Sequence, residues 1–166
     1  MLHPAVMARA IAILFLAFCA AACAHLSVIH LSKAPWVPGT QTTLSTRHWT
    51  FVFRGDYQDG RLVLQGTALP REGEIPSWAT WAQDLWIQVY LSDASGRVLA
   101  SDLRLYLPLD IRKGVPLEFH LAPKSVGAEG PLSVSFGYRM ELTTAPGVRP
   151  EAEPQVFFAS QGALFQ

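Results

Sequence analysis

The sequence lacks an excess of charge of either sign. Its 166 residues carry 13 Lys and Arg against 13 Asp and Glu, so the formal net charge is zero, and no basic run occurs. A protein that binds nucleic acid needs a positive field to displace the counterions of the phosphates, and a polybasic membrane patch needs the same field. We therefore expect neither nucleic-acid binding nor an electrostatic membrane patch.

Cysteine is equally scarce, since Cys19 and Cys23 are the only two. No cysteine follows Cys23, so the chain beyond it has no disulfide and no thiolate ligand for a metal ion. The five histidines do not stand at the i, i+2 or i, i+4 spacings that aim two imidazoles at one metal. We expect them, His48 and His120 included, to be solvated, and we predict no metal and no cofactor.

The sequence also lacks the common catalytic patterns. It has no G-x-S-x-G elbow for a serine nucleophile and no glycine-rich loop for phosphate. Glu72 and Glu74 form an acidic pair, but their place among loop residues favours a solvated turn over an acid and base. We therefore expect that the protein is not an enzyme.

One long apolar run is present, at the N-terminus. Residues Ala10 to Ala24 are uncharged and follow Arg9, and the run passes from bulky to small side chains toward its end. About 20 apolar residues are needed to span a bilayer, so this run is short for an anchor and typical of a signal segment. Small residues allow a peptidase to approach the backbone, and the pattern therefore predicts export. Met7 would serve equally well as the start of such a signal.

The end of this run resembles the lipobox of bacterial lipoprotein precursors. Ala20, Ala21 and Ala22 supply small residues before Cys23, although the family prefers leucine where Ala20 stands. Cys19 is the weaker choice because bulky Phe18 precedes it. The resemblance implies removal of residues 1–22 and acylation of Cys23. It also implies sorting to an outer membrane, facing the periplasm, because Ala24 rather than aspartate follows the cysteine.

Two alternatives remain open for this segment. The run could be an uncleaved anchor, extended past His25 and His30, that makes the protein a single-pass structural subunit of a membrane complex. It could also be a plain secretory signal cleaved after Ala22 or Ala24.

The remaining chain shows the period of β-strands. Residues 23–47 are rich in Pro, Gly, Thr and Ser, which predicts an extended linker. Alternation of apolar and polar residues begins at Trp49 and recurs in Leu85–Leu91 and Leu132–Leu142. We predict an all-β, antiparallel, immunoglobulin-like sandwich of six or seven strands over residues 48–142, with Ile87 and Phe136 central to its core. Residues 143–166 are expected to form a proline-rich tail with an edge strand near 155–160.

The stretch from Leu62 to Leu142 also resembles small immunoglobulin-like domains of secreted prokaryotic proteins, the FxLYD-type family. The similarity rests on the strand Leu85–Leu91, the loop from Asp93 to Gly96 and Gly114 ahead of Phe119. Members of that family often carry an asparagine after the glycine and valine of the second strand. Here Gly66 is followed by Thr67 and Ala68, so this part of the pattern is missing. The resemblance implies a binding or assembly module.

The segment Ile75–Tyr90 holds three of the five tryptophans. Trp78 and Trp81 could anchor a protein interface, or they could plug the open end of the sandwich, which is the interpretation we favour. Together these features predict a non-enzymatic envelope lipoprotein, anchored to the membrane through Cys23 and serving an envelope protein partner.

Overall fold

The computed structural model describes residues 25–59, 61–122, 130–145 and 155–166. The predicted signal, with Cys19 and Cys23, lies outside these residues. All strand pairs between named strands in the described part are antiparallel, and the only helical element is one short 3-10 turn, η1 (Ile111–Lys113). The strands are β1 (Leu26–Ser27), β2 (Lys33–Pro35), β3 (Gln41–Ser45), β4 (Trp49–Gln58), β5 (Arg61–Pro70), β6 (Trp81–Ser92), β7 (Val98–Tyr106), β8 (Leu109–Asp110), β9 (Val115–Leu121), β10 (Ser133–Thr143), β11 (Phe157–Gln161) and β12 (Leu164–Phe165).

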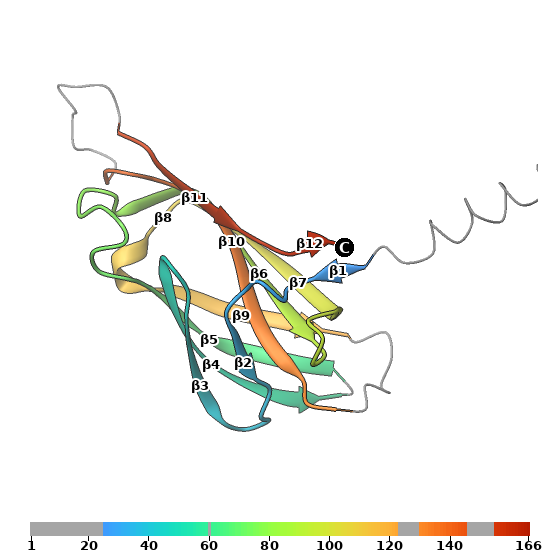
Figure 1. The fold of residues 1–166 in the computed structure, drawn as a ribbon. Coiled ribbons are helices and arrows are strands. Elements are labelled where there is room, and N and C mark those ends of the chain that lie inside the picture. The colour runs from blue at the N-terminus through green and yellow to red at the C-terminus, as the bar shows by residue number, and fades with distance from the viewer. Residues whose placement is uncertain (1–24, 60, 123–129, 146–154) are drawn as a thin grey trace, which may run out of the picture.

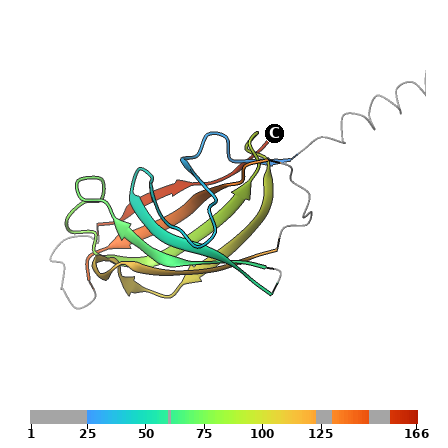
Figure 2. The same ribbon diagram turned by 90° about the horizontal axis from the view of Figure 1, so that it is seen from below.

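Two sheets pack face to face, and a two-stranded ribbon lies at one end (Figures 1 and 2). The larger sheet has the order β11-β10-β6-β7, with β2 added to β10 and β8 added to β6. The smaller has the order β3-β4-β5-β9, and the ribbon pairs β1 with β12. The chain crosses between the two sheets four times, after β2, after β5, after β8 and after β9. The fold is therefore the antiparallel all-β sandwich that the sequence predicts.

An aromatic cluster joins the two sheets. The rings of Phe51 on β4 and Phe136 on β10 are stacked, with centroids 4.1 Å apart and planes within 6°. Phe53 and Phe119 contact Phe136 from the smaller sheet as well, at 5.3 and 6.3 Å. Phe136 and Ile87 are fully buried, which confirms their predicted place in the core. The alternation of the strands produces this arrangement, since every second residue of β9 faces the core.

Side chains of β7 close one edge of the sandwich. The Tyr106 hydroxyl donates to the carbonyl of Pro116 at 2.8 Å, and Nε of Arg104 donates to the carbonyl of Glu118 at 2.8 Å. The backbone N–H of His120 donates to Oδ2 of Asp102 at 2.9 Å. These side-chain hydrogen bonds connect β7 and β9 in place of a backbone ladder. They also protect two strand edges that could otherwise pair with a strand of another chain.

The segment predicted as a linker belongs in large part to the domain. Leu44 of β3 pairs with Phe51, and Ala34 of β2 pairs with Val134. Both Leu44 and Ala34 are buried in the core. The polar composition of β3 misled the prediction, because an edge strand buries only one of its faces. The folded unit therefore begins well before residue 48.

The C-terminal segment contains the expected edge strand. It is β11, which pairs with β10 from Leu142↔Phe157 to Tyr138↔Gln161. The chain then continues into β12, which pairs with β1. Besides β3, the prediction of six or seven strands missed the short strands β1, β2, β8 and β12, since two or three residues are too few for alternation to be visible.

Phe136→Ala should lower the free energy of unfolding by about 3–5 kcal/mol, because it removes the ring that three other phenylalanines contact. Phe158→Ala is the matched control, since Phe158 lies in the same sheet but is exposed. Chemical denaturation of both variants measures the difference. Equal losses in the two variants would show that the aromatic cluster is not the centre of the core.

Candidate functional site

The most distinctive surface of the protein is the outer face of the larger sheet. Large apolar side chains gather there and remain exposed instead of facing the core. We call this surface the outer-face patch, and its members are Trp86, Leu103, Leu105, Arg139 and Phe158.

Strand register brings these residues together. Trp86 on β6 pairs with Leu105 on β7 and with Arg139 on β10. Side chains at such paired positions lie on the same face of the sheet, with Cβ atoms about 4.5–5.5 Å apart. Leu105 is 66 % exposed, so no described part of the chain covers the centre of the patch.

A single cation lies among the aromatic rings of the patch. The guanidinium of Arg139 is 5.1 Å from the centroid of the Trp86 ring and 5.8 Å from that of Phe158. Its Nη2 is also 3.8 Å from Oδ2 of Asp84. Stacking on two rings restricts the arginine side chain, so the patch presents a fixed charge within an apolar surface.

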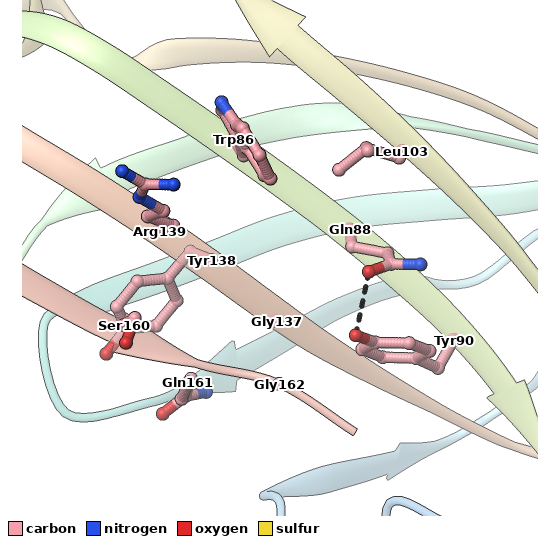
Figure 3. Close-up of a pocket in the computed structure, with 10 residues that line it drawn as sticks. All are labelled: Trp86, Gln88, Tyr90, Leu103, Gly137, Tyr138, Arg139, Ser160, Gln161 and Gly162. Carbon is pink, nitrogen blue, oxygen red and sulfur yellow. Dashed lines mark hydrogen bonds between the residues drawn. The ribbon is translucent and has the colours of Figure 1, made fainter. Parts of the chain in front are cut away.

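A hollow of about 260 Å³ adjoins the patch (Figure 3). In Figure 3, Trp86 and Arg139 lie on one side of it, Tyr90 lies on the other, and Gln88 stands between them. Gly137 leaves room for the Tyr90 ring, since a Cβ on this glycine would lie 3.0 Å from Cε2 of Tyr90. The hollow has the size of a socket for one side chain.

Tyr90 fixes the far wall of this hollow. Its hydroxyl donates to Oε1 of Gln88 at 2.9 Å and accepts from the backbone N–H of Ala163 at 3.2 Å. Its ring is buried with Val28 and Leu31 in a second, small cluster outside the main core. Burial raises the pKa of Tyr90 above its usual value, although the bond from Ala163 opposes this. The phenol therefore stays neutral and acts as a fixed hydrogen-bonding group.

The two tryptophans singled out from the sequence do not share one environment. Trp78 lies in the loop before β6 and packs against the main core. Trp81 is the first residue of β6, half-buried, and pairs with Thr143 on one side and Asp110 on the other. The structure thus does not bring them together as one loop surface.

A second hollow, of about 410 Å³, lies beside this loop and is lined in part by Arg71, Glu72, Ile111 and Arg112. Its two arginines are engaged already. Arg112 binds Asp110 at 2.6 Å and holds the pKa of that carboxyl at about 2, and Arg71 donates to the carbonyl of Thr46. Within the described ranges, no three His, Cys, Asp or Glu side chains are placed to hold a metal ion.

His48 is a correction to the prediction of solvated histidines. It is only 8 % exposed, and its Nδ1 shares a 2.7 Å hydrogen bond with the hydroxyl of Tyr138. Its ring also meets Phe157 edge-on at 5.6 Å. Burial lowers the pKa of His48, and neighbouring Arg47 lowers it further against an opposing effect of Glu74. This histidine is a structural group that joins the β3–β4 turn to β10 and β11, whereas His120 is exposed as expected.

His48 should make the protein less stable in acid. The unfolded chain takes up the proton near pH 6.5, whereas the folded chain resists it until its lowered pKa is reached. Stability should therefore fall as the pH drops below 6.5, and His48→Gln should reduce this dependence. Thermal denaturation between pH 7.5 and 5 measures it, with His120→Gln as the exposed control. An unchanged pH dependence in His48→Gln would contradict this assignment.

The sequence did not reveal the outer-face patch. Leu103 and Leu105 alternate with Asp102, Arg104 and Tyr106, which normally places the leucines in the core. The register of β7 on β6 instead places these leucines on the outer face. The polar side chains of β7 take the opposite face, where they form the hydrogen bonds to β9.

The comparisons with known proteins give no family, since no protein-family model, curated protein or solved structure matches the chain significantly. In the part of the chain that the structure describes, no helix has the length and apolar character needed to cross a membrane.

Proposed function

We propose that this protein is a non-enzymatic lipoprotein of the cell envelope. Acylated Cys23 tethers it to a membrane, most simply the outer membrane on its periplasmic side, and the sandwich binds an envelope protein through the outer-face patch. The observation that supports a binding role most directly is the exposed cluster of Trp86, Leu105 and Phe158 around Arg139.

The chemistry of the patch suits a protein partner. Contiguous exposed apolar surface with a polar rim is typical of interaction sites. Tryptophan and arginine are the residues that most often dominate the binding energy of protein interfaces. The adjoining hollow beside Gly137 offers a socket for an apolar or aromatic side chain of the partner, as buried anchors require.

The strand order favours the same role. The strands β4-β5-β9 of one sheet face the strands β11-β10-β6-β7 of the other. This is the order of an immunoglobulin-like sandwich in which the fourth strand, here β7, lies beside the third, here β6. Such domains commonly act as binding or assembly modules, and this agrees with the resemblance noted in the sequence. The fold supports the proposal without identifying the partner.

Cys23→Ser should abolish membrane attachment. Each buried methylene contributes about 0.8 kcal/mol of membrane affinity, so several acyl chains hold a protein that one chain would not. Detergent phase separation and the intact mass of the mature protein give the readout, and Cys19→Ser is the matched control. Retention of residues 1–22 together with unchanged partitioning would instead favour the single-pass subunit with an uncleaved anchor.

Substitutions in the patch should disrupt partner binding without unfolding the domain. A photoreactive residue at Leu105 should form a defined crosslink in cells, and Trp86→Ser should weaken it, since loss of a hot-spot residue costs about 2 kcal/mol or more, which is over tenfold in affinity. The melting temperature should change little, because Trp86 lies outside the main core and is 38 % exposed.

Leu69 provides the control for this experiment. It lies on β5 in the opposite sheet and is 41 % exposed, close to the 42 % of Leu103 in the patch. A photoreactive residue at Leu69 should give no matching adduct. The same adducts from Leu69 and Leu105, or none from Leu105, would contradict the proposed surface.

A further inference from the structure

The N-terminal end of the described chain is fixed to the body of the protein. His25 and Gln166 exchange two backbone hydrogen bonds of 3.0 Å, and Leu26 and Ser27 pair with β12. The N–H of Val28 then donates to the carbonyl of Gly96 at 2.9 Å. No free length of chain therefore separates the sandwich from residue 25.

This docking depends on one glycine. Gly96, in the turn between β6 and β7, has a φ of +84°, and a Cβ there would lie 2.9 Å from the backbone of Ile29. The side chains of Val28 and Leu31 are buried beside Tyr90. The segment after residue 25 is thus packed on the larger sheet and does not act as a tether.

The attachment point must lie close to the fold. Cys23 is two residues before His25, and consecutive Cα atoms are 3.80 Å apart, so their Cα atoms are separated by at most about 7.6 Å. Acyl chains on Cys23 would emerge beside the β1–β12 ribbon.

Three exposed apolar side chains lie on this ribbon or close to it in the chain. Phe165 is 81 % exposed, and Leu164 and Ile29 are each more than half exposed. We call these three residues the ribbon tip. Phe165 and Leu164 belong to β12, and Ile29 comes two residues after β1. Figure 1 places the ribbon at the end of the molecule opposite the loop that carries Ser77 and Trp78.

We propose that the ribbon tip is a lipid-binding surface that rests in the interfacial layer of the membrane holding the protein. This inference rests on the proposed function, because it requires a membrane anchor immediately before His25. With no slack in the chain, the anchor brings the tip to the bilayer, and burial of Phe165, Leu164 and Ile29 there removes apolar surface from water. The sandwich is then held in one orientation, with the loop around Ser77 pointing away.

A fluorophore at position 165 tests this arrangement. The mature protein carrying Phe165→Cys is labelled with a polarity-sensitive dye and reconstituted in vesicles of phosphatidylethanolamine and phosphatidylglycerol that contain spin-labelled phosphatidylcholine. We expect emission at shorter wavelength and loss of most of the fluorescence to the lipid-borne quencher. Ile29→Cys should behave alike and guards against local damage to β12. Ser77→Cys is the matched control and should be neither shifted nor quenched.

The unsubstituted protein, labelled in parallel, gives the background from native cysteines. Flotation and intact mass of the same samples report separately on attachment and on acylation of Cys23. Quenching at positions 165 and 29 no greater than at 77, in protein that floats, would overturn the lipid-binding tip and leave the lipoprotein proposal intact. Flotation without acylation would overturn the lipoprotein proposal. The quenching would still test whether the ribbon tip binds lipid, because an uncleaved N-terminal anchor would also join the domain at His25. Protein that does not float would defeat both.

Discussion

The stacked pair of Phe51 and Phe136 is the contact on which the rest of the structure depends. It lies where β4 and β10, the central strands of facing sheets, approach each other, and Phe53 and Phe119 surround it. This cluster lies within the apolar core that holds the sheets together, and the exposed side chains of the outer-face patch are not part of that core. Exposed side chains such as Leu105 on the larger sheet therefore call for an explanation other than stability.

A second, smaller cluster around Tyr90 has a different task. It lies on the outer face and buries Val28 and Leu31, while the Tyr90 hydroxyl binds the backbone at Ala163. The two ends of the described chain are thereby held on one strand, β6. Gly137 makes this possible, because only a residue without a Cβ leaves full room for the tyrosine ring. The segment between the proposed lipid anchor and the domain is consequently part of the fold.

The sequence predicted the features that long alternating strands determine. The alternation in Leu85–Leu91 and Leu132–Leu142 identified two central strands, the antiparallel sandwich and the burial of Phe136. The prediction from alternation failed for strands in which the apolar residues are few or do not face the core. β3 is polar because it is an edge strand, and β7 turns its leucines outward because its polar residues bond β9. His48 was misjudged because its partner, Tyr138, is 90 residues away. The outer-face patch depends on the register of four strands, β6, β7, β10 and β11, which local sequence does not specify.

Strand β6 fixes the position of the outer-face patch relative to the N-terminal segment that leads to the ribbon tip. Trp86, in the patch, precedes Tyr90 by four residues, which corresponds to about 13 Å along a strand. Tyr90 holds the segment that leads from the proposed anchor, so the proposed anchoring would also keep the patch near the membrane. In the proposed arrangement, a partner that reaches the patch would itself stand at the membrane surface. The cation of Arg139 between two rings would suit a protein surface better than a lipid tail, whereas the ribbon tip, with Phe165 and Leu164, presents exposed apolar side chains without a charge among its three residues. The short connection between the proposed anchor at Cys23 and His25 would thus determine the orientation of the domain. Through that orientation it would also determine which class of partner can reach the patch.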